Sequence, residues 1–281
     1  MSSSKFGLIK LILKQKRVTI GLAILCFLLV YGLASFFYPI NPTAPMFGVL
    51  DPPSSRNPFG TDAIGRDVFA QTLHGTWYSL KIGFFAGVLT TIIGIVVGGI
   101  GGYFGKIIDE ALSTLTNVVM TIPTLALLIV ISSYIPIHNE WIMILLIASV
   151  SWPWCARAIR AAVLSLKTRE FVDIARQLAL GRVRIIFIEI LPNILAYVVM
   201  SLALSIGVAI ISEASLSALG LGPTDVISLG IILRWAITFN AAGIGAWWWL
   251  LPPGILICLC STSLLLIKDG LDQFFNPRAR R

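Results

Sequence analysis

Few residues in this chain have the types and spacing that catalysis, metal binding or nucleotide binding requires. The stretch Gly101–Lys106 has the glycine content of a phosphate-binding loop, but Ile100 replaces its first glycine and Ile107 replaces the required serine or threonine. The two histidines, His74 and His138, have no partners at metal-ligand spacing, and the four cysteines form no CxxC pair. The sequence therefore predicts a non-catalytic chain with no metal site and no cofactor of its own.

The most ordered polar segment is Glu170–Asn193, which reads EFVDIARQLALGRVRIIFIEILPN. Its first half has apolar side chains at the spacing of one helix face, namely Phe171, Ile174, Ala175, Leu178 and Ala179. We expect Gly181 to end this helix and a second short helix, Arg182–Ile190, to be stopped by Pro192. Small residues at Ala175 and Ala179 would leave a flat surface where another protein docks. The alternative is a solvated loop.

The composition explains why this polar segment stands out. The 281 residues are 57% hydrophobic and 12% charged, whereas soluble domains carry roughly 25% charged residues. A membrane-spanning helix needs about 20 mostly apolar residues. We therefore predict an all-α polytopic membrane protein with six transmembrane helices, the fourth continuing as a helix to Leu166. The six apolar runs are Val18–Tyr38, Ile82–Phe104, Ala111–Ser133, Trp141–Cys155, Ile194–Ser212 and Trp247–Ile267.

The basic residues are distributed unevenly along the chain. Of the 21 Lys and Arg residues, 17 fall in Ser2–Arg17, at Lys106, in Ala156–Glu189 or from Lys268 onward. Positive residues gather on the cytoplasmic side of membrane proteins. We therefore expect the polar segment and both termini to be cytoplasmic, in the plasma or inner membrane. The net charge of +8 is therefore explained by the orientation of the chain in the lipid bilayer. This distribution disfavours a nucleic-acid partner.

The chain divides into three predicted parts. Residues 1–77 form an N-terminal segment with a basic lead-in, the first span and a proline-rich external loop. Residues 78–269 hold the other five spans, and 270–281 form a basic cytoplasmic tail. Small residues on one face permit close helix packing. The second span has such a face, formed by Gly83, Gly87, Gly94, Gly98 and Gly102.

Two further polar features are candidates for structure or contact. The external motif consists of Gly60, Asp62, Gly65, Arg66 and Asp67. Asp62 is expected to cap a short helix over Ala63–Leu73, and Arg66 to form an exposed ion pair with Asp62 or Asp67. We interpret the motif as a structural turn, with contact to a partner protein as the alternative. Glu213, at the outer end of the fifth span, faces a pore or marks the membrane boundary.

The polar segment resembles the signature of ABC-importer permeases, which is Glu-Ala-Ala, three residues, Gly, nine residues, Ile, one residue, Leu-Pro. The spacing is kept from Asp173 to Pro192. The conserved letters remain at Ala175 and at Leu191–Pro192. The positions that depart from the signature are Asp173, Ile174, Ala179 and Glu189.

Other stretches resemble the dipeptide/oligopeptide/nickel group of these permeases. They are NPFGTDAIGRDVFAQTLHGTWYSLKIG at Asn57–Gly83, LGLG at Leu219–Gly222 and WWWLLPPGILICLCSTSLLLIKDGLDQFFNPR at Trp247–Arg278. The basic lead-in and the proline-rich first loop are similar to those of the C-type subunit of the group's two permeases. The resemblance covers nearly the whole chain.

This resemblance implies a type I ABC-importer permease fold, with an ABC transmembrane type-1 domain over 78–269. The chain would form half of a pore with a paralogous B-type permease. Two ATPase subunits would bind ATP and Mg and hydrolyse ATP, and an extracytoplasmic solute-binding protein would deliver the cargo. A coupling helix at about Arg169–Gly181 would dock on one ATPase. The implied docking residues are Glu170, Asp173, Ile174, Ala175, Arg176, Ala179 and Gly181.

The resemblance favours di- or oligopeptides as cargo, and oligosaccharides or nickel are alternatives for the same machine. A stand-alone secondary transporter or channel is an alternative from another class. Such proteins usually place ionisable residues inside their spans. The six apolar runs contain none, which disfavours that alternative. A purely structural membrane subunit would not need the ordered polar segment.

Overall fold

The computed structural model describes residues 15–136 and 139–275. The expectations for most of the basic lead-in, for His138 and for the last six residues therefore lie outside the described residues. The elements are α2 (Lys16–Leu33), η1 (Ala34–Phe36), α3 (Val68–Phe104), α4 (Lys106–Thr121), α5 (Thr124–Ser133), α6 (Glu140–Leu166), α7 (Glu170–Gln177), α8 (Arg182–Arg184), the π-helix η2 (Ile185–Ile190), the 3₁₀-helix η3 (Leu191–Ile194), α9 (Leu195–Ala218), α10 (Leu229–Thr238) and α11 (Trp247–Phe275).

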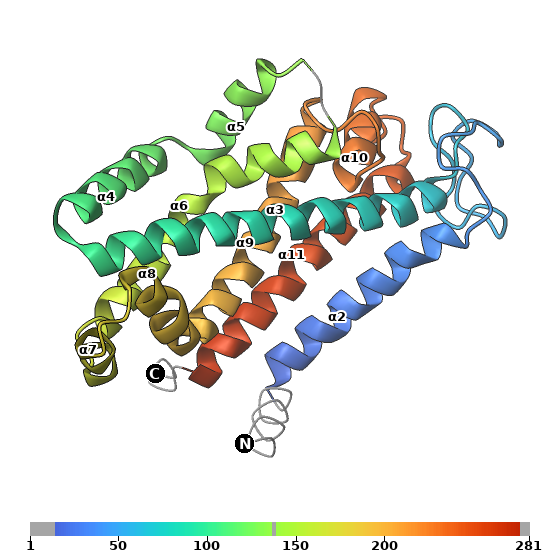
Figure 1. The fold of residues 1–281 in the computed structure, drawn as a ribbon. Helices are drawn as coiled ribbons and strands as arrows, with labels where there is room; N and C mark the ends of the chain where they lie inside the picture. Colours follow the sequence, from blue (N-terminus) through green and yellow to red (C-terminus); the bar gives the residue numbers. More distant parts are fainter. Residues whose placement is uncertain (1–14, 137–138, 276–281) are drawn as a thin grey trace.

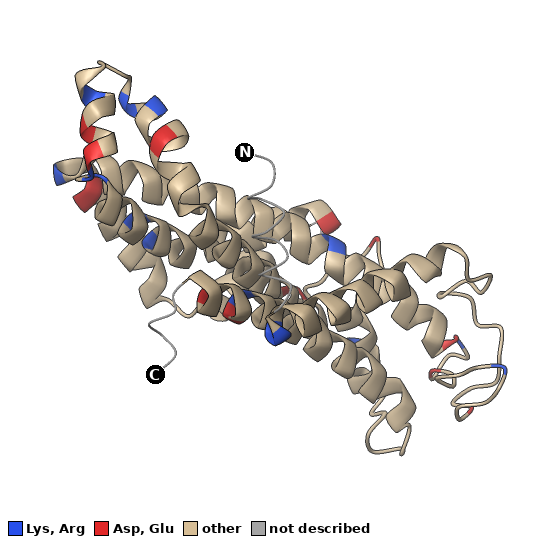
Figure 2. Cartoon of the chain, turned by 90° about the horizontal axis from the view of Figure 1, so that it is seen from below, with Lys and Arg blue, Asp and Glu red and all other residues tan. Residues whose placement is uncertain are grey.

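The helix α3 is the centre of the bundle. It packs most extensively against α6 and α9, while α11 packs against α2 and α9. Figure 1 shows α7 at one end of the bundle and the loop that precedes α3, together with α10, at the other. We call these the α7 end and the α10 end. Charged residues gather near α7, and the helices between the two ends carry few of them (Figure 2).

Five helices of the described chain are long and apolar enough to cross a membrane. A sixth span exists if α4 and α5 are counted together, although they meet at an angle of 84°. The span expected at Ala111–Ser133 is therefore formed by two helices and is not one unbroken helix. Ile122, which precedes Pro123, has an extended backbone (φ −91°, ψ 128°). A residue before proline is driven out of the helical region, so the span breaks there.

Two other helix boundaries differ from the expected ones. The short helix expected at Ala63–Leu73 does not form separately, because α3 runs without a break for 37 residues from Val68 to Phe104. Pro192 does not stop the helix before the fifth span. It lies in η3, and Arg182–Ala218 forms one candidate span that changes from α to π to 3₁₀ and back to α. Asn193 Nδ2 donates to the Glu189 carbonyl at 2.7 Å and pairs one carbonyl beside the proline.

The five glycines of the second span lie against two different helices. A Cβ at Gly87 would lie 2.7 Å from Ile206 Cα of α9, and one at Gly83 would meet Ile210. Toward the α7 end, a Cβ at Gly94 would lie 2.6 Å from Cys155 Cβ of α6. Ala156 and Arg160 of α6 likewise lie against Gly98 and Gly102. The glycine face therefore admits α9 along its first half and α6 along its second.

Candidate functional site

The helix α7 is short and packs against the chain through one face. Val172 and Ala175 are buried there, in a cluster with Ile159, Val163 and Ile185. Glu170 and Asp173 lie in its first turn and Arg176 in its last, which matches the helix dipole. The inward face therefore includes Ala175, so the expectation that Ala175 packs against a partner protein is wrong.

The opposite face of α7 exposes large apolar side chains. Ile174 is 56% exposed and Leu178 is 68% exposed. Val183 and Ile188, in the segment that follows, are also exposed. Such side chains beside charged ones are typical of a contact surface. The predicted single apolar face is thus divided: Ala175 turns inward, whereas Ile174 and Leu178 turn outward.

Arg176 fixes α7 to the rest of the bundle. Its Nη1 lies 2.8 Å from Asp173 Oδ1, and its Nη2 donates to the Lys167 carbonyl at 3.0 Å, at the end of α6. Its guanidinium lies 5.6 Å from the centre of the Tyr103 ring in α3. Hydrogen bonding to Tyr103 and the charge of Asp173 raise the pKa of Arg176. Arg176 therefore contacts both the end of α6 and α3.

The turn that ends α7 is made at Ala179, not at Gly181. Ala179 has a left-handed backbone (φ 54°), whereas Gly181 has φ −60° and precedes α8. Leu180 N donates to the Ala175 carbonyl at 3.2 Å, and Ala179 N donates to the Arg176 carbonyl at 3.0 Å. This is the bond pattern of a Schellman motif, whose left-handed residue is usually glycine. The expected role of Gly181 is therefore wrong.

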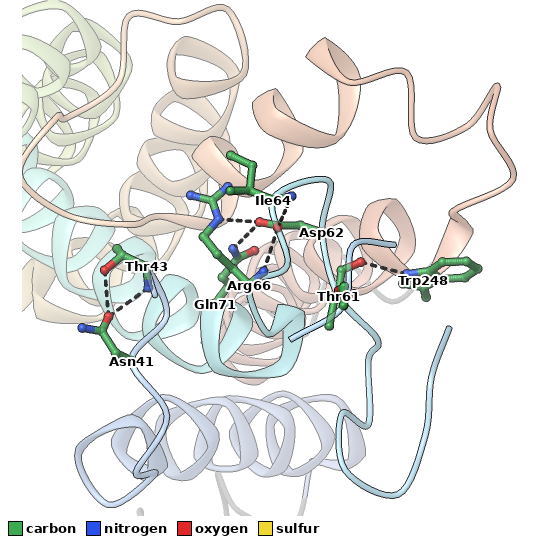
Figure 3. A network of polar contacts seen from close by, with 9 residues as sticks. Asn41, Thr43, Thr61, Asp62, Ile64, Arg66, Gln71 and Trp248 are labelled. Carbon is green, nitrogen blue, oxygen red and sulfur yellow. Dashed lines mark hydrogen bonds and ion pairs between the residues drawn. The ribbon is translucent and has the colours of Figure 1, made fainter. Parts of the chain in front are cut away.

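The external motif forms a buried turn at the α10 end. Asp62 is buried and accepts hydrogen bonds from the backbone N–H groups of Ile64 and Arg66, both at 2.9 Å. Its carboxylate also accepts from Arg66 Nε at 2.6 Å and Gln71 Nε2 at 2.8 Å (Figure 3). The Arg66 guanidinium lies 4.0 Å from the centre of the Trp235 ring of α10. The predicted exposed ion pair is thus a buried one.

Asp67, not Asp62, caps the helix. Its side chain accepts from Phe69 N at 2.9 Å at the start of α3, and Tyr38 Oη donates to it at 3.1 Å. Burial raises the pKa of Asp67 and raises the pKa of Tyr38 to about 12. Gly60 and Gly65 hold positive φ angles of 62° and 83° in this turn, which favour glycine. All five residues of the motif therefore take part in one structural turn.

Glu213 has a role that the sequence did not indicate. It is fully buried inside α9 and accepts from Ser217 Oγ at 2.6 Å and Ser79 Oγ at 3.1 Å. Ser79 Oγ in turn accepts from Leu229 N at 3.1 Å, so the network joins α3, α9 and α10. The expectation that Glu213 faces a pore is therefore wrong, and its position at the membrane boundary stays a prediction. In the sequence, Ser217, one helical turn away, was a feature from which this hydrogen bond could have been predicted.

The comparison with known families decides the class of protein. The family described as "Binding-protein-dependent transport system inner membrane component" matches residues 90–281. The chain belongs to this family. It is a multi-pass membrane protein and the permease subunit of an ABC importer. The family match begins later than the predicted five-span domain and includes the predicted tail.

Relatives and solved structures agree with this family. A Brucella suis protein named as a peptide permease is 38% identical over 228 residues, covering 81% of this chain and 75% of its own length. The "Oligopeptide transport system permease protein OppC" of Mycobacterium bovis is 34% identical, covering 83% and 79%. An inward-facing MetNI methionine ABC transporter chain has a TM-score of 0.57 at 20% identity, covering 74% and 95%. The last likeness concerns the fold.

Proposed function

We propose that this permease forms half of the translocation path of a peptide importer, and that α7 is the helix on which an ATPase docks. The relatives named for peptide transport support the cargo. Oligosaccharides and nickel are the alternative cargoes that a transport assay would separate. The permease itself carries out no hydrolysis; ATP and Mg bind to the partner ATPase.

The observation that carries this proposal is the divided surface of α7. Val172 and Ala175 hold the helix to the bundle, and Ile174 and Leu178 are left exposed beside Glu170 and Asp173. A short helix of this kind fits a groove with an apolar floor and a polar rim. Because Arg176 ties α7 to α6 and α3, a shift of the ATPase would move the helices of the path.

The distribution of charge supports an orientation and a set of partners. The excess of Lys and Arg near α7 supports a cytoplasmic location for that end, and we propose the same side for both termini. The α10 end then faces outward, where a solute-binding protein delivers cargo. A second, B-type permease completes the path, and two ATPases dock below the pair.

The test is reconstitution of the chain with its second permease, ATPases and binding protein in vesicles. We expect Leu178→Asp to reduce ATPase co-purification and peptide uptake about tenfold or more, because it removes a large apolar contact and introduces a charge. The matched control is Leu219→Asp, since Leu219 is 61% exposed but lies at the α10 end.

Normal uptake by Leu178→Asp, or wild-type uptake without any ATPase, would contradict the docking proposal. Uptake of oligosaccharide or Ni²⁺ in place of peptide would contradict the proposed cargo but not the proposed docking of α7 on an ATPase. The yield and thermal midpoint of each variant show whether the fold is retained.

A further inference from the structure

A cavity of about 460 Å³ lies among α3, α5, α6 and α9. Half of its lining residues carry hydroxyl groups, and the others are apolar or cysteine. No Asp, Glu, Lys or Arg is among the described residues that line it. The hydroxyl-bearing residues are Thr90, Thr124, Ser151, Ser201, Ser205, Ser212 and Ser215.

The serines of α9 form one stripe along an otherwise apolar helix. Ser201, Ser205, Ser212 and Ser215 recur at spacings of four, seven and three residues, which places them on one face. The large side chains that line the cavity between them, Leu204, Val208 and Ile211, are exposed in this chain. The stripe is thus an open polar track bordered by apolar side chains.

Two hydroxyl groups in this cavity lack the partners that buried polar groups require. Thr90 is 1% exposed, and among the described residues neither its Oγ1 nor Ser151 Oγ has a hydrogen-bond partner. The adjacent Thr91 Oγ1, by contrast, donates to the Gly87 carbonyl at 2.8 Å. A buried hydroxyl without a partner is costly, above all inside a membrane. The cavity therefore favours a polar occupant, which could pair with these hydroxyl groups.

We propose that the transported peptide passes along this hydroxyl-lined cavity. The hydroxyl groups bind the peptide main chain and do not discriminate between its side chains by charge. The proposal rests on the proposed function. A hydroxyl both donates and accepts, so it pairs with either the N–H or the C=O of any residue. A fixed charge in such a surface would select peptides by sign, because Coulomb interactions are strong at low dielectric constant.

The experiment places a charge on the wall of the complete transporter in vesicles. Ser205 is half-buried in the stripe. The uptake of Ala-Ala-Ala, Ala-Glu-Ala and Ala-Lys-Ala is measured for Ser205→Asp and Ser205→Lys, each relative to wild type with the same binding protein. We expect Ser205→Asp to slow Ala-Glu-Ala about tenfold relative to Ala-Lys-Ala, and Ser205→Lys to reverse that order. Ser133→Asp, at an exposed serine of α5 outside the cavity lining, should change neither ratio.

The other outcomes each contradict a specific part of the account. Equal effects on the three peptides, or no effect, would contradict the proposal that the peptide passes along this cavity. Loss of the second permease on purification of both Ser205 variants would also overturn it, since the cavity would then be an interface between subunits. Failure of the wild-type transporter to import any of the three peptides would contradict the proposed function itself.

Discussion

The two ends of the molecule treat polar and apolar groups in opposite ways. The α10 end buries the charged groups of Asp62, Arg66 and Glu213 and supplies hydrogen-bond partners to the two carboxylates from its own side chains. The α7 end leaves its Asp173–Arg176 pair and two large apolar side chains exposed. The carboxylates of Asp62 and Glu213 are paired within this chain, although Arg66 Nη2 and Gln71 Oε1 have no partner among the described residues. The exposed face of α7 is the surface for which we propose an ATPase as partner.

This difference has an energetic consequence. Removing one member of a buried ion pair leaves an uncompensated charge, which costs about 3–5 kcal/mol. An exposed pair contributes about 0–1 kcal/mol. Substitutions at the α10 end should therefore change stability, and those on the outer face of α7 should change association.

Asp62→Ala should have the largest effect on stability and would test the comparison most severely. It leaves Arg66 and Gln71 without their acceptor, and we expect a loss of about 3–5 kcal/mol. The matched change at the other end, Asp173→Ala, should cost less than about 1 kcal/mol. Thermal unfolding of the detergent-purified variants measures both. Equal shifts of the two midpoints would contradict the contrast between the ends.

Glu213 tests whether the second buried network depends on shape and hydrogen bonding or on charge. Glu213→Ala leaves the hydroxyls of Ser79 and Ser217 without their acceptor and should cost about 1–3 kcal/mol. Glu213→Gln keeps an oxygen at the same position and should lose less than half as much. The same unfolding measurement ranks them. A loss for Gln as large as that for Ala would show that an amide oxygen cannot replace the carboxyl group.

The turn after α7 provides the smallest and most specific effect. Ala179→Gly should stabilise the chain by about 1 kcal/mol, because a left-handed backbone strains any residue with a Cβ. Gly181→Ala should be neutral or slightly stabilising, since its φ is −60° and a Cβ at this position would have no neighbouring atom within 4 Å. If Ala179→Gly and Gly181→Ala both destabilised the chain, the left-handed turn would lie at Gly181 and not at Ala179.

Periodicity and composition predicted the elements that depend on local pattern. The apolar runs predicted the spans, because length and hydropathy alone decide whether a helix can cross a bilayer. The turn after α7 was predicted at Gly181, but the left-handed residue is Ala179, which occupies the glycine position of the signature. The pairing of glycines with neighbouring helices required the structure, because Gly87 and Gly94 differ in partner and not in pattern.

The predictions that were wrong share one physical cause. Whether Asp62 is exposed, or which way Ala175 faces, depends on elements distant in sequence: Trp235 covers Arg66, and Ile159 and Ile185 enclose the inner face of α7. The pairing of Glu213 could be predicted only in part, because Ser217 lies one helical turn away but its second donor, Ser79, lies 134 residues away. Burial of a polar group can be predicted only when its partners are known.

The docking of α7 is tested most directly by photo-crosslinking from position 178 in the complete transporter. A benzophenone amino acid replaces Leu178 in one variant and Leu219 in the other, and the complex is irradiated during ATP-driven uptake. We predict an adduct between position 178 and an ATPase subunit, and none from position 219. An active transporter that gives no ATPase adduct from position 178, or an equal one from position 219, would contradict it.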